Sequence, residues 1–221
     1  MPPAASAQHT EVHIATPNVT LPGNLDMPEN ATGLVVFAHG SGSSRFSPRN
    51  CAVAESLQDR GLATLLFDLL TEREDEIDQK TRAIRFDVKL LGQRLAEVVD
   101  WVRQQDNLAS LPVGLFGAST GAAAALIAAA ARPDSVHAIV SRGGRPDLAD
   151  DALPRVQSPT LLIVGGLDTT VIDMNQTAAE QMDCENQLEI VEGASHLFEE
   201  PGKLDEVASL AGEWFTQKLK S

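Results

Sequence analysis

The sequence predicts an α/β protein with a mostly parallel central sheet, an antiparallel pair of strands at its N-terminal end, and helices on both faces. Short apolar runs typical of strands alternate along the chain with helical patterns, which is the order that builds a parallel sheet. Most of these runs are apolar at every position, as in strands covered on both sides. The first two runs are joined only by a short turn at Pro17-Asn18, which suits antiparallel neighbours.

The first half of the chain supplies four of the expected strands. They are expected at Glu11–Ala15, Val19–Leu21, Leu34–Ala38 and Leu62–Leu70. Between the last two, Ser47-Pro48 has a capping hydroxyl followed by proline in the first turn, so a helix begins there, and Gly61 ends it. Residues 71–80 contain five acidic side chains and are expected to form a solvated loop.

The second half continues the alternation of helices and strands. From Arg82 to Val102, apolar side chains recur at helical spacing. Further helices are expected at Thr120–Ala131, at Val171–Met182 and from Leu204 to Leu219. The remaining strands are expected at Val113–Phe116, Val136–Val140, Leu161–Val164 and Leu188–Val191. Loops at the carboxyl ends of such strands build the functional site.

Composition narrows the classes of function. The 221 residues carry 17 Lys and Arg against 31 Asp and Glu, a net charge of −14, which disfavours nucleic-acid and anionic-membrane partners. No targeting segment is evident, and the longest apolar run, residues 122–131, is shorter than the ~20 residues a spanning helix needs. Cys51 and Cys184 lie far apart and are expected to be reduced, which favours the cytoplasm. No Cys or His spacing suggests a metal site.

One domain is expected. Residues 1–10 are predicted to be a short flexible N-terminus and residues 11–221 a single domain. The segment at 145–158 is too short for a cap domain, so the site is expected to be fairly open, in a monomer or homodimer that acts on a small molecule.

A nucleophile motif follows one of the predicted strands. Gly117-Ala118-Ser119-Thr120-Gly121 fits the pattern G-x-S-x-G, which places a serine on a sharp turn between a strand and a helix. A serine hydroxyl needs a base and an orienting acid. Asp168 and His196 each follow a predicted strand, in the chain order serine, acid, histidine that this arrangement requires. We therefore expect Ser119, His196 and Asp168 to act as nucleophile, base and orienting acid, with activity falling in acid as His196 is protonated.

A second loop is suited to stabilising negative charge on the substrate. His39-Gly40-Ser41-Gly42 follows the strand Leu34–Ala38, where a donor of the oxyanion hole is expected. We expect the backbone N–H groups of Ser41 and Thr120 to form this hole, with the N–H of Gly42 as the alternative to that of Ser41.

These motifs resemble the alpha/beta-hydrolase superfamily, and within it the lidless dienelactone-hydrolase-like group. The resemblance covers the chain from Glu11 onward and includes the elbow motif, residues 39–50 and Ser141-Arg142-Gly143-Gly144-Arg145-Pro146. It implies an alpha/beta-hydrolase fold, a triad of Ser119, Asp168 and His196, and no cofactor. Similar sequences also occur joined to a phosphoribosyltransferase-like domain. The dienelactone hydrolases proper use a cysteine nucleophile, so Ser119 points to a more general esterase.

Several arginines could recognise an acidic group on the substrate. Arg142 and Arg145 follow the strand Val136–Val140, and Arg45 lies beside the oxyanion loop. A guanidinium suits a carboxylate, although pairing with acids such as Asp147 is equally consistent with the sequence.

The sequence therefore predicts a serine hydrolase of small carboxylic esters or thioesters that forms an acyl-enzyme. A serine-dependent acyltransferase or perhydrolase uses the same intermediate and remains an alternative. So do two alternatives of another class, an inactive ligand-binding relative and an NAD(P)-binding oxidoreductase. The segment 114–121 lacks the G-x-G-x-x-G spacing of a dinucleotide turn, and the chain has no Tyr to serve as the base of a short-chain dehydrogenase.

Overall fold

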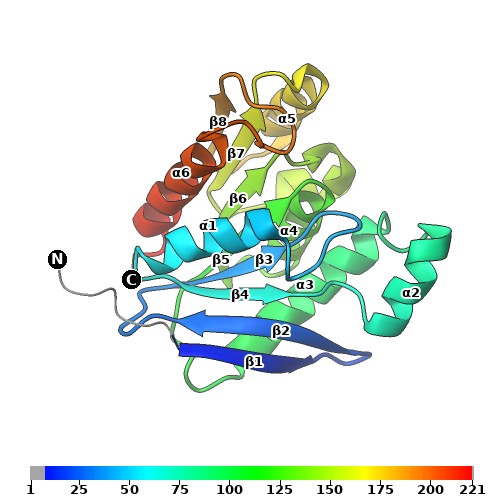
Figure 1. Ribbon diagram of the computed structural model, residues 1–221, viewed down its shortest axis with the longest axis vertical. Helices are drawn as coiled ribbons and strands as arrows, with labels where there is room; N and C mark the ends of the chain where they lie inside the picture. Colours follow the sequence, from blue (N-terminus) through cyan, green and yellow to red (C-terminus); the bar gives the residue numbers. More distant parts are fainter. Residues whose placement is uncertain (1–7, 221) are drawn as a thin grey trace.

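A computed structural model of the chain describes residues 8–220, whose strands form one eight-stranded sheet in the order β1-β2-β4-β3-β5-β6-β7-β8 (Figure 1). The β1–β2 and β2–β4 pairs are antiparallel, and every other pair is parallel. This confirms the predicted α/β fold with its antiparallel N-terminal pair. The strands are β1 (Gln8–Ala15), β2 (Thr20–Met27), β3 (Leu34–Ala38), β4 (Ala63–Phe67), β5 (Val113–Ala118), β6 (Val136–Arg142), β7 (Thr160–Gly165) and β8 (Asn186–Val191).

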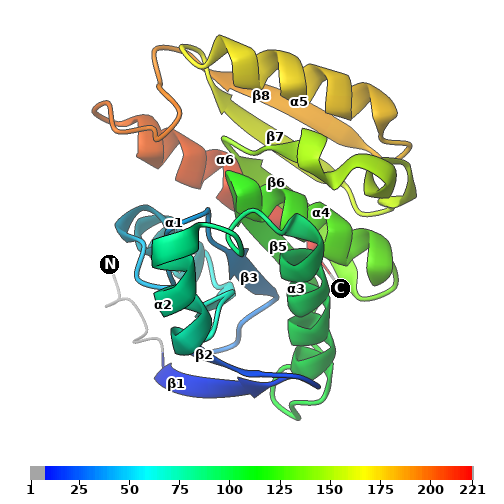
Figure 2. The ribbon, with the colours of Figure 1, turned by 90° about the vertical axis from the view of Figure 1, so that its right-hand side faces the viewer.

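Helices cover both faces of the sheet. They are α1 (Pro48–Gln58), α2 (Glu72–Thr81), α3 (Val88–Arg103), α4 (Thr120–Ala131), α5 (Thr169–Gln181) and α6 (Lys203–Lys218), with 3₁₀ turns, η1, at Pro146–Arg155. On one face, α1 and α6 pack through Leu57 and Phe215 in a cluster with β-strand side chains. On the other face lie α3, α4 and α5, which stand in front of the strands in Figure 2.

The acidic segment after β4 is a helix, so the expectation of a solvated loop is wrong. Thr71 caps α2: its hydroxyl accepts the Glu74 N–H, and the Glu74 carboxylate accepts the Thr71 N–H at 2.9 Å. Acids in the first turn also suit the positive end of a helix. Glu74 then forms two hydrogen bonds to the buried Arg94 of α3, at 2.5 and 2.8 Å, which anchors α2 to the body of the protein.

Some element boundaries also differ from the prediction. Gln8, His9 and Thr10, expected in the flexible N-terminus, belong to β1 and pair with residues 25–27 of β2, while residues 1–7 lie outside the described part. The helix expected from Arg82 begins at Val88, because the Asp87 side chain caps it by accepting the Leu90 N–H at 3.0 Å.

The parallel strands β3 to β8 all end at the same edge of the sheet, and their following loops carry the residues singled out in the sequence. None of the helices within residues 8–220 combines the length and apolarity required to cross a bilayer. The fold therefore places the predicted site residues at the carboxyl edge of the parallel strands.

Candidate active site

Ser119 lies on a strained turn between β5 and α4. Its backbone has φ 51° and ψ −119°, a combination that non-glycine residues rarely adopt and that costs on the order of 1–3 kcal/mol. Ser119 occupies the N-cap of α4, yet its side chain makes no capping hydrogen bond, and within residues 8–220 its hydroxyl has no hydrogen-bond partner. The hydroxyl is thus left available for another group.

The segment after β6 holds this turn in place. The Ser119 N–H donates to the Arg142 carbonyl at 3.1 Å, and the Ser119 carbonyl accepts the Arg145 N–H at 3.1 Å. Gly144 fits between because a side chain there would lie 2.6 Å from Ala122 Cβ. The motif that the sequence suggested for its arginines therefore also supports the strained serine through its backbone.

Asp168 and His196 are in direct contact. His196 Nδ1 lies 2.6 Å from Asp168 Oδ2. Asp168 stands at the N-cap of α5 but does not cap it with its side chain, so it is not simply a helix cap. The loops after β7 and β8, which carry Asp168 and His196, are joined by a hydrogen bond from the Leu167 N–H to the Ala194 carbonyl at 2.9 Å. A carboxylate at Nδ1 favours the tautomer with a proton there, which leaves Nε2 as a proton acceptor.

A glycine connects this pair to the serine turn. A Cβ atom at Gly143 would be 3.5 Å from His196 Nδ1 and 3.0 Å from the His196 carbonyl oxygen. Gly143 directly follows Arg142, whose carbonyl binds the Ser119 N–H. The ring of His196 and the turn of Ser119 thus both lie against the end of β6.

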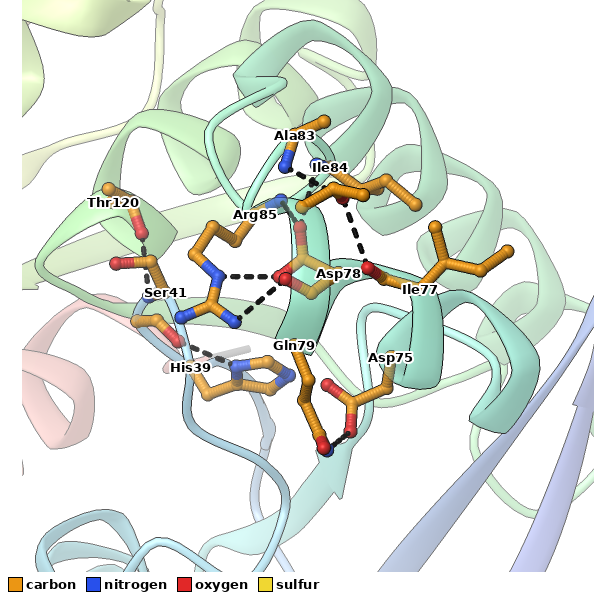
Figure 3. A network of polar contacts seen from close by, with 12 residues as sticks. His39, Ser41, Asp75, Ile77, Asp78, Gln79, Ala83, Ile84, Arg85 and Thr120 are labelled. Carbon is orange, nitrogen blue, oxygen red and sulfur yellow. Dashed lines mark hydrogen bonds and ion pairs between the residues drawn. The ribbon is translucent and has the colours of Figure 1, made fainter.

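The loop after β3 packs against the serine turn. A Cβ atom at Gly40 would lie 3.3 Å from Ser119 Cβ and 3.2 Å from the Ala118 carbonyl oxygen, so a side chain here would crowd the serine turn. The Ser41 N–H donates to the Thr120 hydroxyl at 2.9 Å, as Figure 3 shows. As the first residue of α4, Thr120 also has its own N–H at the free end of the helix. The two predicted oxyanion donors therefore lie close together.

His39 ties this loop to the end of β4. Its Nδ1 donates to the Gly40 carbonyl at 2.9 Å, and its Nε2 accepts the Leu69 N–H at 3.1 Å. Burial lowers the pKa of His39 below its ordinary value of 6.5, and the hydrogen bond to Gly40 only partly opposes this. A neutral ring is what this pair of bonds requires, because Nε2 must accept.

The burial of His39 predicts a loss of stability in acid. Below about pH 6.5 the unfolded chain takes up a proton that the folded chain resists, so the free energy of unfolding falls by up to ~1.4 kcal/mol per pH unit from this group. Urea unfolding at a series of pH values should show a shallower acid dependence for His39→Gln than for the unchanged protein. Equal slopes in the two proteins would contradict this assignment.

The Thr120 hydroxyl is predicted to align the Ser41 N–H. Loss of one such hydrogen bond is worth about 1 kcal/mol, so we expect Thr120→Val to lower kcat/KM for a p-nitrophenyl ester about fivefold. Thr120→Ser retains the hydroxyl and should keep most of the activity. A faster Thr120→Val variant would instead mean that this hydroxyl competes with the substrate for the Ser41 N–H.

Two of the three arginines singled out in the sequence are paired within the chain. Arg45 binds Asp68 and lies 3.5 Å from Glu11, and Arg145 forms two hydrogen bonds to Asp147 at 2.7 and 2.8 Å. These contacts match the alternative in which the arginines pair with acidic side chains of the chain itself. The role of Arg45 and Arg145 in substrate binding therefore stays a prediction.

Arg142 is different, because it is buried and incompletely paired. Its Nη2 donates to Asn50 Oδ1 at 3.3 Å, while Nε and Nη1 have no protein partner in the described chain. Burial, and then the nearby Arg49, lower the pKa of Arg142 to about 10. Its role in binding substrate also stays a prediction. No group of three or more His, Cys, Asp and Glu side chains within residues 8–220 is arranged to hold a metal ion.

Comparison with known proteins identifies relatives over nearly the whole chain. A family model described as an alpha/beta hydrolase domain matches residues 31–211. A Mycobacterium tuberculosis protein named "Putative phosphoribosyl transferase" is 55% identical over 209 residues, which are 95% of this chain and 46% of that protein. The chain thus spans about half the length of the curated relatives it matches.

Solved structures give a consistent result. A dienelactone hydrolase from Anabaena variabilis is 58% identical, with a TM-score of 0.96 over 97% of this chain and 100% of that one. Est1E from Butyrivibrio proteoclasticus is 18% identical, with a TM-score of 0.78 over 94% of this chain and 98% of that one. The second likeness concerns the fold alone.

Proposed function

We propose that this chain, which belongs to the dienelactone-hydrolase-like group of the alpha/beta-hydrolase family, is a serine hydrolase of small carboxylic esters or thioesters. One arrangement carries the proposal: Ser119 adopts a strained backbone at a helix N-terminus without capping the helix, and the turn of Ser119 and the Asp168-bound ring of His196 both lie against the end of β6. A strained turn whose hydroxyl makes no hydrogen bond lowers the stability of the folded protein. A role of this hydroxyl as a nucleophile explains why the protein adopts such a turn.

In the proposed mechanism, the Ser119 oxygen attacks the carbonyl carbon of the ester while His196 Nε2 takes the hydroxyl proton. The negative oxygen that forms is bound by the N–H groups of Ser41 and Thr120, and the Ser41 N–H is shared between this oxygen and the Thr120 hydroxyl that aligns it. The carbon–oxygen bond of the leaving alcohol then breaks, and His196 returns the proton to that alcohol.

The resulting acyl-enzyme is hydrolysed by the reverse sequence. Water attacks the acyl carbon as His196 removes one of its protons, and the Ser119 oxygen leaves as the proton returns to it. Asp168 stabilises the imidazolium in both halves of the reaction by accepting its Nδ1–H.

Apolar side chains at the same edge of the molecule support a substrate with an apolar part. The five large apolar side chains that are exposed within residues 8–220 all lie on loops or on α2, after β3, β4, β7 and β8. They are Phe46, Ile77, Phe86, Leu167 and Leu197. Exposed apolar side chains on the loops that follow parallel strands suit the binding of a small organic molecule.

A fluorophosphonate probe tests the proposal. It reacts with an activated serine, so the purified protein should acquire one adduct, and peptide mass spectrometry should locate it on Ser119. Folded protein that stays unlabelled, or that carries the adduct on another serine, would overturn the mechanism.

We further infer a reducing compartment, the cytoplasm, because Cys51 and Cys184 are both free in the structure. A monomer or homodimer remains the predicted assembly.

A further inference from the structure

A cavity of about 460 Å³ opens on the far side of the oxyanion loop from His196. It is lined by residues 39–46, by the segment after β4 and by α2, and Gly40, Ser41 and Gly42 belong both to its wall and to the oxyanion loop. None of Ser119, Asp168 and His196 lines it. The cavity therefore adjoins the proposed site without containing the reacting groups.

The order of the strands says which part of an ester would reach this cavity. Ser119 follows β5 and His196 follows β8, whereas the cavity lies beside β3 and β4, on the opposite side of Ser119 along the sheet. In the proposed reaction the leaving alcohol takes its proton from His196 and so lies on the β8 side. The acyl group then extends across the oxyanion loop towards the cavity.

Arg85 presents a fixed donor in the cavity wall. Its Nε donates to Asp78 Oδ2 at 2.5 Å and its Nη2 donates to the Asp78 carbonyl at 3.3 Å. Asp78 is itself buried and also accepts the Ile84 N–H at 2.7 Å. Burial alone would raise the pKa of Asp78, but the hydrogen bonds from Arg85 and Ile84 hold it below its usual value.

The remaining end of this guanidinium points towards the oxyanion loop. No hydrogen bond from Arg85 Nη1 to another residue within 8–220 is formed, and a Cβ atom placed on Gly42 would lie 2.8 Å from it. Figure 3 shows Arg85 held by Asp78 on one side, with its free end towards Ser41. A donor fixed in this way loses little entropy when it binds a ligand.

The charges around the cavity disfavour an anion. The two cations in its wall, Arg45 and Arg85, are each paired with a carboxylate, Asp68 and Asp78. The other two acids in the wall, Glu72 and Asp75, form no ion pair within the described residues, although Asp75 accepts a hydrogen bond from Gln79. The wall thus combines a hydrogen-bond donor, Arg85, whose charge is balanced by Asp78, with the unbalanced negative charges of Glu72 and Asp75. Phe46, Leu69, Leu70 and Leu91 add apolar surface.

We propose that this cavity receives the acyl group of the substrate, and that Arg85 selects uncharged acyl groups that carry a hydrogen-bond acceptor oxygen over both carboxylated and purely apolar ones. The proposal rests on the proposed ester hydrolysis and adds the substrate class. Apolar walls hold the carbon chain, the Arg85 Nη1–H binds the oxygen, and Glu72 and Asp75 repel a carboxylate.

Three methyl esters with acyl chains of similar length test this. They are dimethyl glutarate, which is neutral with acceptor oxygens, methyl hexanoate, which is apolar, and monomethyl glutarate, which is anionic at neutral pH. Methanol release followed by NMR should give the highest kcat/KM for dimethyl glutarate and the lowest for monomethyl glutarate, beyond the twofold factor of its two ester groups. Equal values, or a preference for monomethyl glutarate, would overturn the proposal.

Variants then assign the selectivity to named residues. Arg85→Met should lower kcat/KM for dimethyl glutarate at least tenfold and that for methyl hexanoate much less, because only the first ester uses the donor. Arg73→Met is a matched change at an exposed position of α2 and should leave kcat/KM for both esters unchanged. An equal loss on all three esters would mean that Arg85 is structural.

A second variant leaves the buried ion pair of Arg85 and Asp78 intact. Glu72→Gln combined with Asp75→Asn removes both uncompensated charges and should raise kcat/KM for monomethyl glutarate about fivefold at low ionic strength, without a matching gain for dimethyl glutarate. An unchanged selectivity would contradict the charge argument. If no ester releases methanol and Ser119 takes no fluorophosphonate, the proposed function itself fails; labelled Ser119 with no acyl preference refutes only the present inference.

Discussion

Ser119→Ala should lower kcat/KM for a p-nitrophenyl ester by roughly 10⁵- to 10⁶-fold, because no other group in the proposed site can form the acyl-enzyme. The hydroxyl is small and unpartnered in the described chain, so its removal leaves no buried polar group without a bond. Steady-state rates and the fluorophosphonate adduct should be lost together, while the unfolding midpoint stays within a few degrees.

Ser209→Ala is the matched control. Ser209 lies in the middle of α6 rather than in a loop after a strand, and its hydroxyl donates to Glu213 and accepts from Arg60. This variant should keep full activity and labelling. If Ser119→Ala kept more than a small fraction of the activity, the acyl-enzyme mechanism would be wrong.

The order of strands and helices could be predicted because buried parallel strands leave a local signal. Runs such as Leu34–Ala38 are apolar at every position, and β3 is buried throughout. Helix α2 was missed because its composition is that of a solvated segment, and its stability comes from contacts at its ends. One local signal was present: Thr71-Glu72-Arg73-Glu74 has the spacing of a capping box, which the structure contains. The anchoring of Glu74 to Arg94 has no such signal, because it joins positions twenty residues apart.

In the candidate site, too, some features have a signal in the sequence and others do not. The positions of Ser119, Asp168 and His196 after their strands follow from motif and chain order, and His196 Nδ1 lies 2.6 Å from Asp168 Oδ2. The triad itself stays a prediction. The sequence did not identify Arg85, because its place beside Gly42 depends on how the segment after α2 folds around the buried Asp78. It also gave no role to His39, whose bond to the Leu69 N–H joins the ends of two neighbouring strands. For Arg45 and Arg145, only the structure distinguishes a free guanidinium from one already paired.

Gly121→Ala should destabilise the protein, although alanine is the better helix former. In an exposed helix this change would stabilise by up to ~1 kcal/mol. At Gly121, however, a Cβ atom would lie 2.6 Å from the His39 carbonyl oxygen and still closer to that of Ala38, and both belong to the backbone at the end of β3. Neither β3 nor α4 can move away without separating the oxyanion loop from the serine turn.

The steric cost at Gly121 should therefore exceed the gain in helix propensity, with a net loss of about 3 kcal/mol or more. For a protein of this size that corresponds to a fall in Tm of about 6–12 °C, measurable by circular dichroism. Gly61→Ala separates crowding from backbone strain, because Gly61 has φ +79° but no atom within 4 Å of an added Cβ. That variant should lose only about 1–2 kcal/mol. If Gly121→Ala were as stable as the unchanged protein, β3 and α4 could not be packed as closely as the proposed oxyanion hole requires.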